Sequence, residues 1–120
     1  MLRRFLTLGI GDIQTVSANL AGMQSAGGTA YGKTDISGTP GNGTVNTPLG
    51  RCAIAAAASS VVITSSICTA TSRVMAMINQ AAADATAVSI ARVVPAAGSF
   101  TIFPVAAATA NTVVDFVVFP

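Results

Sequence analysis

Between residue 51 and the C-terminus, short runs of β-branched and other apolar residues alternate with short turn segments. Runs of this length, bounded by Gly, Pro, Ser and Asn, are typical of β-strands. We expect strands over residues 51–57, 61–67, 73–79, 88–94, 99–105 and 112–119, although the alanines of the first run are equally compatible with a helix. Gly98 should close a tight reversal over residues 95–98 with a positive φ. Five or six strands joined by short turns predict an all-β fold, either a small antiparallel β-sandwich or a jelly-roll-like domain.

The N-terminal part of the chain has a different character. Residues 25–50 are so rich in Gly and Pro that they predict neither a helix nor a central strand. The apolar residues between Leu2 and Ile10 alternate loosely enough to form a strand. We therefore divide the chain into an extended N-terminal arm and loop region over residues 1–48 and a β-sandwich domain over residues 49–120.

Two of the expected strands are apolar on both faces. In 112–119, one face carries Val114, Phe116 and Val118, and the opposite face carries Val113, Asp115, Val117 and Phe119. In 73–79, one face carries Val74, Ala76 and Ile78, and the opposite face carries Met75 and Met77. An antiparallel strand with one face in water should alternate apolar with polar residues. Each strand is therefore expected to be covered twice, once by its own core and once by a partner.

The composition agrees with a surface that other molecules cover. Only 8% of the 120 residues are charged and 52% are hydrophobic, whereas a typical globular domain carries about 25% charged residues. An exposed apolar face of this kind would be an aggregation hazard, so we expect obligate oligomerisation or docking. The suspected subunit or capsid interface consists of Leu2, Phe5, Leu6, Met75, Met77, Val113, Val117 and Phe119.

Membrane insertion and secretion are not expected. The uncharged stretch 52–72 is rich in Ser and Thr, and Pro and Gly interrupt the uncharged stretch 93–114. The N-terminus imitates a signal peptide, but Asp12 and Gln14 lie where the apolar region should continue. The six basic residues, which give a net charge of +2, are scattered along the chain, so a nucleic-acid-binding surface is not expected either.

The sequence offers little chemistry. Residues 27–34, Gly-Gly-Thr-Ala-Tyr-Gly-Lys-Thr, fit the phosphate-binding P-loop pattern, but the preceding segment is no hydrophobic strand and the following one cannot be a helix. We interpret the match as a chance Gly-rich loop. The chain has no His, and its four Asp residues are isolated, so we expect no enzyme, cofactor or metal site. Cys52 and Cys68 could pair across neighbouring strands, but two small buried thiols are the favoured reading.

Residues 92–102, Arg-Val-Val-Pro-Ala-Ala-Gly-Ser-Phe-Thr-Ile, together with 50–66 and 106–112, resemble a module of structural proteins in tailed bacteriophages. The resemblance covers roughly residues 40–120, including the lead-in 39–48. It implies a small β-sandwich that decorates capsids or lies in fibres, without catalytic residues.

From these features together we expect a virion structural protein of the capsid decoration or cement type. It would be assembled in the host cytoplasm, lie on the capsid surface, bind the major capsid protein and self-associate as a dimer or trimer. The alternative is a trimeric fibre or spike domain that binds a host receptor. The chain has few aromatic residues, Tyr31 and five Phe, which favours the decoration role.

Overall fold

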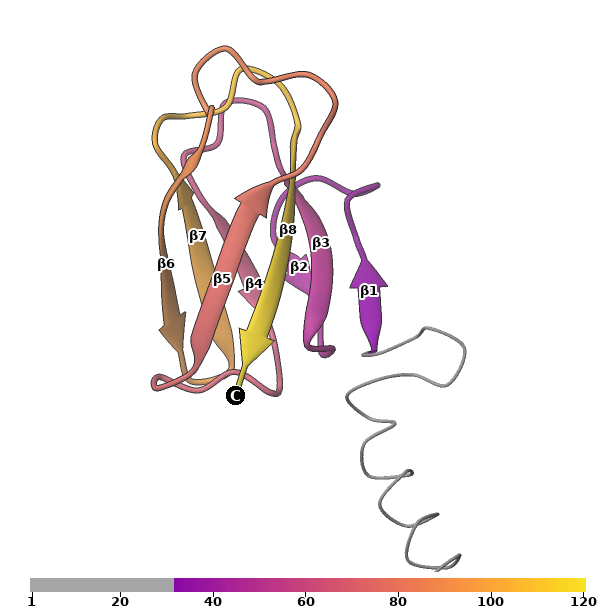
Figure 1. Ribbon diagram of the computed structural model, residues 1–120, viewed down its shortest axis with the longest axis vertical. Helices are drawn as coiled ribbons and strands as arrows, with labels where there is room; N and C mark the ends of the chain where they lie inside the picture. The colour runs from indigo at the N-terminus through magenta and orange to yellow at the C-terminus, as the bar shows by residue number, and fades with distance from the viewer. Residues whose placement is uncertain (1–31) are drawn as a thin grey trace, which may run out of the picture. The chain divides into compact units, whose positions relative to one another are not determined.

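The structure is a computed structural model in which residues 32–120 are described, and these residues contain eight β-strands and no helix. The strands, labelled in Figure 1, are β1 Lys33–Asp35, β2 Gly43–Thr44, β3 Leu49–Ile54, β4 Val61–Thr64, β5 Arg73–Ile78, β6 Ile90–Ala96, β7 Ser99–Pro104 and β8 Thr112–Phe119.

The strands form two four-stranded sheets, in the orders β1-β3-β8-β5 and β2-β4-β7-β6. We call them the front and the rear sheet, after their places in Figure 1. Both sheets contribute to one hydrophobic core, so the fold is a small β-sandwich, as the sequence predicts. The six long strands pair antiparallel, whereas β1 pairs with β3 and β2 with β4 in parallel. The sheets are therefore mixed rather than wholly antiparallel.

The core is built from alternate residues of the central strands. Phe100 of β7 and Phe116 of β8 meet edge to face, with their ring centroids 4.9 Å apart and the ring planes at 67°. The other large, fully buried apolar side chains are Ile54, Ile63, Ile102, Val45, Val61, Val114 and Val118. Alternation along β8 places Val114, Phe116 and Val118 inward, as expected from the sequence.

β1 and β2 lie within 25–50, where the sequence predicts only loop. Two asparagines help to hold β2 and the residues next to it beside β4 and the loop that follows β4. Asn42 accepts a hydrogen bond from the Val62 N–H and Asn46 accepts one from the Ser66 N–H, each at 2.9 Å. The compact unit consequently covers Lys33–Pro120, whereas the sequence division places its beginning at residue 49.

Some strands begin or end at other residues than expected, and one reason is that a neighbouring residue forms its backbone hydrogen bond with a loop instead of with the paired strand. β3 ends at Ile54, before Ala57, which has a φ of 68° and donates its N–H to the Ala108 carbonyl. The helical alternative for this run is therefore wrong. β6 lies two residues later than predicted and continues through Pro95 to Ala96. Gly98 closes the β6–β7 hairpin with a φ of 77°, which confirms the positive φ expected there.

The loops 79–89 and 105–111 lie at the upper end of the sandwich in Figure 1. Asp84 joins the two loops. Its carboxylate accepts hydrogen bonds from the backbone amides of Thr86, Ala87, Thr109 and Ala110, at 2.9–3.1 Å, and from the Thr109 hydroxyl at 2.8 Å. These bonds hold the pKa of Asp84 far below its usual range, and the amide of Ala87 has the largest effect. The side chain is 7% exposed, so the loop end is closed around it.

Candidate interaction surface

The outer face of the front sheet carries three of the six large apolar side chains that are exposed among residues 32–120. Met75 and Met77 of β5 are 65% and 64% exposed, and Phe119 of β8 is 50% exposed. The strand register places Leu49, Val117 and Met75 in one row across β3, β8 and β5. We call this surface the methionine face and define it by Leu49, Met75, Met77, Val113, Val117 and Phe119, together with Arg51 and Asp115.

Five of the eight suspected interface residues lie on this one face: Met75, Met77, Val113, Val117 and Phe119. The other three, Leu2, Phe5 and Leu6, lie outside the described residues. Leu49 belongs to the face and is missed by the sequence reasoning. The alternation of Leu49 with Arg51 is the signal that could have found it, but Pro48 and Gly50 place the residue in an apparent loop.

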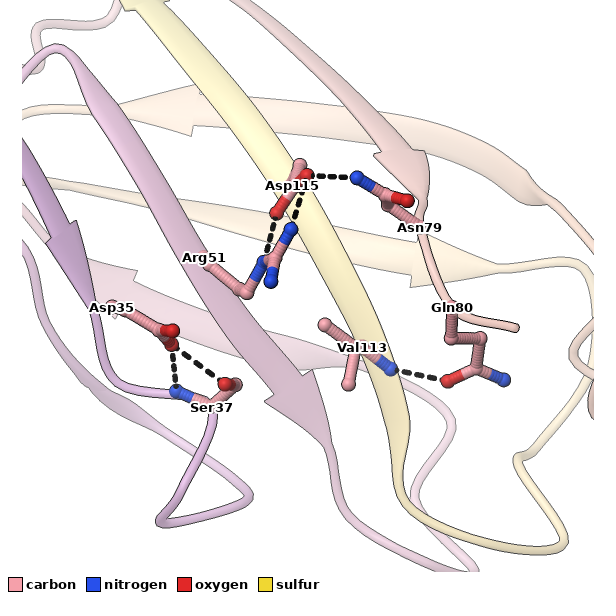
Figure 2. Close-up of polar contacts among 7 residues, drawn as sticks. All are labelled: Asp35, Ser37, Arg51, Asn79, Gln80, Val113 and Asp115. Atoms are coloured by element: carbon pink, nitrogen blue, oxygen red, sulfur yellow. Dashed lines mark hydrogen bonds and ion pairs between the residues drawn. The ribbon is translucent and has the colours of Figure 1, made fainter. Parts of the chain in front are cut away.

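A bidentate ion pair lies within the methionine face. The Arg51 guanidinium donates to both carboxylate oxygens of Asp115 across β3 and β8, at 2.6 and 3.1 Å (Figure 2). The Asn79 amide donates to the second oxygen from the end of β5. The hydrogen bond from Arg51 lowers the pKa of Asp115, and the one from Asn79 acts in the same direction. The two hydrogen bonds fix the orientation of both side chains, so the methionine face contains one ordered ion pair among its apolar side chains.

A second acid lies at the edge of the same sheet. Asp35 of β1 accepts hydrogen bonds from the backbone N–H and the hydroxyl of Ser37, at 2.9 and 2.6 Å (Figure 2). These bonds lower the pKa of Asp35, and the hydroxyl has the larger effect. Asp35 thus turns toward its own loop, whereas Arg51 is held by Asp115.

The methionine face is hollowed rather than flat. A depression of about 300 Å³ is lined by Met75, Met77, Val117, Leu49 and Asp115 with the backbone between them. A second depression of about 470 Å³ lies next to it and shares Leu49 and Asp115; Lys33, Asp35 and Arg51 also line it. The surface therefore offers an apolar hollow beside a charged one.

The outer face of the rear sheet is different in kind. Thr64 and Thr101 contribute hydroxyls there, and the Arg92 guanidinium lies over the Phe103 ring, 4.1 Å from its centroid. The cation covers the aromatic ring, which reduces its exposed apolar surface. Val94, which is 45% exposed, is the large apolar side chain that stands out on this face. The two sides of the sandwich thus differ strongly in apolar exposure.

The groups that could carry chemistry are dispersed or buried. Cys52 and Cys68 are free and buried, which confirms the favoured reading of two small buried thiols. Burial raises the pKa of the Cys52 thiol to about 12. Lys33 and Thr34 lie in β1, whereas a P-loop would begin a helix there; residues 27–31 of that pattern lie outside the described part. Within residues 32–120, no three His, Cys, Asp or Glu side chains gather as metal ligands would.

No helix in the described part of the chain is long and apolar enough to cross a membrane. No family model, curated protein or solved structure matches this chain.

Proposed function

We propose that this protein is a structural subunit of a bacteriophage virion, of the decoration or cement type, that docks onto the major capsid protein through the methionine face. The observation that carries the proposal is the gathering of Met75, Met77 and Phe119, each at least half exposed, on one face of the sandwich. The resemblance of residues 40–120 to phage structural modules is the reason for proposing that the particle is a bacteriophage virion.

The mechanism is the burial of apolar area between neighbouring subunits. A specific interface of standard size covers about 800 Å² on each partner. Apolar area removed from water stabilises by about 25 cal/mol per Å², before the costs of ordering and of lost free motion. Unbranched methionine side chains adapt to an irregular partner surface. The fixed Arg51–Asp115 fork, 41% and 30% exposed, would select the orientation of the subunit more than its affinity.

The test is the binding of the purified protein to expanded empty capsids assembled from the cognate major capsid protein, with host cells as a second target. The Met75→Ser/Met77→Ser double variant removes the apolar side chains of β5 from the face. Val94→Ser is the matched control, because Val94 is also exposed on a strand but belongs to the rear sheet.

We expect stoichiometric capsid binding by the wild type and by Val94→Ser, and loss of binding by the double variant. Both variants should keep the stability of the wild type to within about 0.5 kcal/mol, because the substituted side chains are exposed. Equal binding by both variants would contradict docking through this face. Adhesion to host cells without capsid binding would overturn the decoration role in favour of the fibre or spike alternative.

A further inference from the structure

The four edge strands of the sandwich differ in how they prevent pairing with another chain. β1 has three residues and β2 has two, so both are too short to serve as templates. β6 carries Pro95 and an irregular register between Ile90 and Arg92. Short strands, prolines and bulges are the devices that protect the edges of natural sheets. β5 has none of them, because Arg73–Ile78 contains neither Pro nor Gly and pairs without a register shift.

The edge of β5 that faces away from β8 presents a row of backbone groups that have no hydrogen-bond partner among residues 32–120. The Asn79 N–H donates to the Val113 carbonyl, which fixes the alternation of the ladder between β5 and β8. Arg73, Met75 and Met77 therefore direct their backbone groups to β8, and Val74, Ala76 and Ile78 direct theirs to the open edge. No residue in the range 32–120 forms a hydrogen bond with those six outward N–H and C=O groups. In Figure 1, β5 is the edge strand of the front sheet on the side where β6 of the rear sheet runs beside it.

The sequence of β5 is nearly palindromic. Around Ala76 it reads Val74-Met75-Ala76-Met77-Ile78, so residues at equal distances from Ala76 are alike in size and polarity. A strand of this kind pairs well with itself in the antiparallel direction, since a two-fold axis places each residue opposite its counterpart on the other side of Ala76. This symmetry selects a second copy of the chain as the occupant of the edge.

We propose that β5 pairs antiparallel with β5 of a second copy, with the two-fold axis at Ala76, and so joins two front sheets into one eight-stranded sheet. This register uses all three outward-facing residues, since Val74 pairs with Ile78 of the second copy, Ala76 with Ala76, and Ile78 with Val74. A shift by two residues in either direction leaves one of the three without a partner. The open edge therefore specifies the register as well as the occupant.

The side chains on the methionine face fit the same register. Met75 lies opposite Met77 of the second copy, so four methionines form one apolar patch across the two-fold axis. Arg73, the one charged residue of β5, lies opposite Asn79 of the second copy, so no like charges meet. The pairing does not depend on the proposed capsid binding and leaves the sheet's outer face available on both copies.

The first test is the self-association of the full chain, measured by sedimentation equilibrium. We expect the wild type to dimerise with a dissociation constant below about 100 µM. Ala76→Pro removes the central outward N–H without removing a bond to β8, and should weaken association at least tenfold. Val94→Lys, an equally simple change on the edge strand β6, should leave association unchanged. Ala76→Pro keeps both methionines, so dimerisation and capsid binding are separated.

The second test measures the register and does not rely on a proline in a strand. Met75→Cys and Met77→Cys are purified separately and then oxidised briefly, alone and mixed. Positions 75 and 77 face each other across the two-fold axis at a separation that a disulfide can span. We expect a cross-linked dimer in the mixture and little in either variant alone. A wild type that stays monomeric at about 100 µM, or cross-linking that is equal in all three samples, overturns the proposal.

Discussion

Asp84 shows how a single side chain can close one end of this sandwich. It lies in one loop and accepts hydrogen bonds from two amides of the same loop and two of the loop 105–111. These bonds add to the one backbone bond between the two loops, from the Val105 N–H to the Ser89 carbonyl. The sequence shows this aspartate only as one of four isolated acids. Its partners at residues 109 and 110 are distant in the chain, so no local pattern identifies them.

Asp84 predicts a specific acid sensitivity. Its pKa is lowered in the folded chain, so its contribution to stability is complete above the unfolded pKa of about 3.9 and is lost as the pH falls through the folded value. The urea midpoint of the wild type should therefore fall between pH 5 and pH 2. Asp84→Asn should have a lower midpoint at pH 7 and a smaller decrease on acidification. Asp35→Asn is the control, because Asp35 binds Ser37 alone. An unchanged acid response in Asp84→Asn would contradict the assignment.

Gly50 makes a separate prediction about packing. A Cβ at this position would overlap with Cζ of Phe116, whose ring is buried and rests against Phe100. Gly50→Ala should therefore destabilise the fold by about 1–3 kcal/mol, because the ring has little room to move. Gly38→Ala, which meets nothing within 4 Å, is the matched control in the same urea titration. Equal stability of the two variants would show that the Phe116 ring can be displaced at no cost.

At the scale of the elements, the length of the alternating pattern decides what the sequence can predict. Burial alternates over the eight residues of β8, and the long apolar run is enough for the sequence to predict both its bounds and its two faces. The three residues of β1 and the two of β2 are too few to show any period. β2 lies beside β4 with the help of Asn42, which binds the Val62 N–H, and no local pattern shows this contact. The methionine face is predictable from β5 and β8, but Leu49 joins it only through pairing with a distant strand.

The β6–β7 hairpin carries the prediction that belongs to this scale. Gly98 has a φ of 77° and no atom within 4 Å of a would-be Cβ, so a substitution there is opposed by backbone conformation alone. Gly98→Ala should cost about 1–2 kcal/mol of unfolding free energy. Gly98→Asn should cost less, because Asn tolerates the left-handed region better than Ala. Thermal unfolding of both variants checks the order, and an Ala variant as stable as the Asn variant would contradict it.

At the scale of the whole molecule, the two sides of the sandwich have unequal affinities for water. The front sheet exposes Met75, Met77 and Phe119, whereas the rear sheet exposes one large apolar side chain, Val94, beside threonine and an arginine stacked on phenylalanine. A subunit of this kind has a preferred orientation once a partner is present. The sequence predicts the apolar second faces of two strands, but the contrast between the sheets requires the pairing of all eight.

Oxidation of methionine reports this orientation directly. Met75 and Met77 are exposed in the free chain, so dilute peroxide should convert both to the sulfoxide, as peptide mass spectrometry can record. In the proposed virion particle the same residues should be oxidised several-fold more slowly, because the capsid partner would cover them. Peptides with Met1 and Met23 are mapped separately. Equal oxidation rates in the free and assembled states would contradict the burial of this face.

The placement of the first and last strands has a mechanical consequence. Lys33 and Val117 flank Leu49 in one row of the front sheet, so β1 begins and β8 ends at the same end of the sandwich (Figure 1). A pulling force between Lys33 and Pro120 would therefore peel strands apart from that end rather than shear them along their length. β1, held by three paired residues, should give way first in a weak step, while β8, gripped by β3 and β5 on both sides, resists. Single-molecule stretching should record this order, a small early rupture followed by one dominant event.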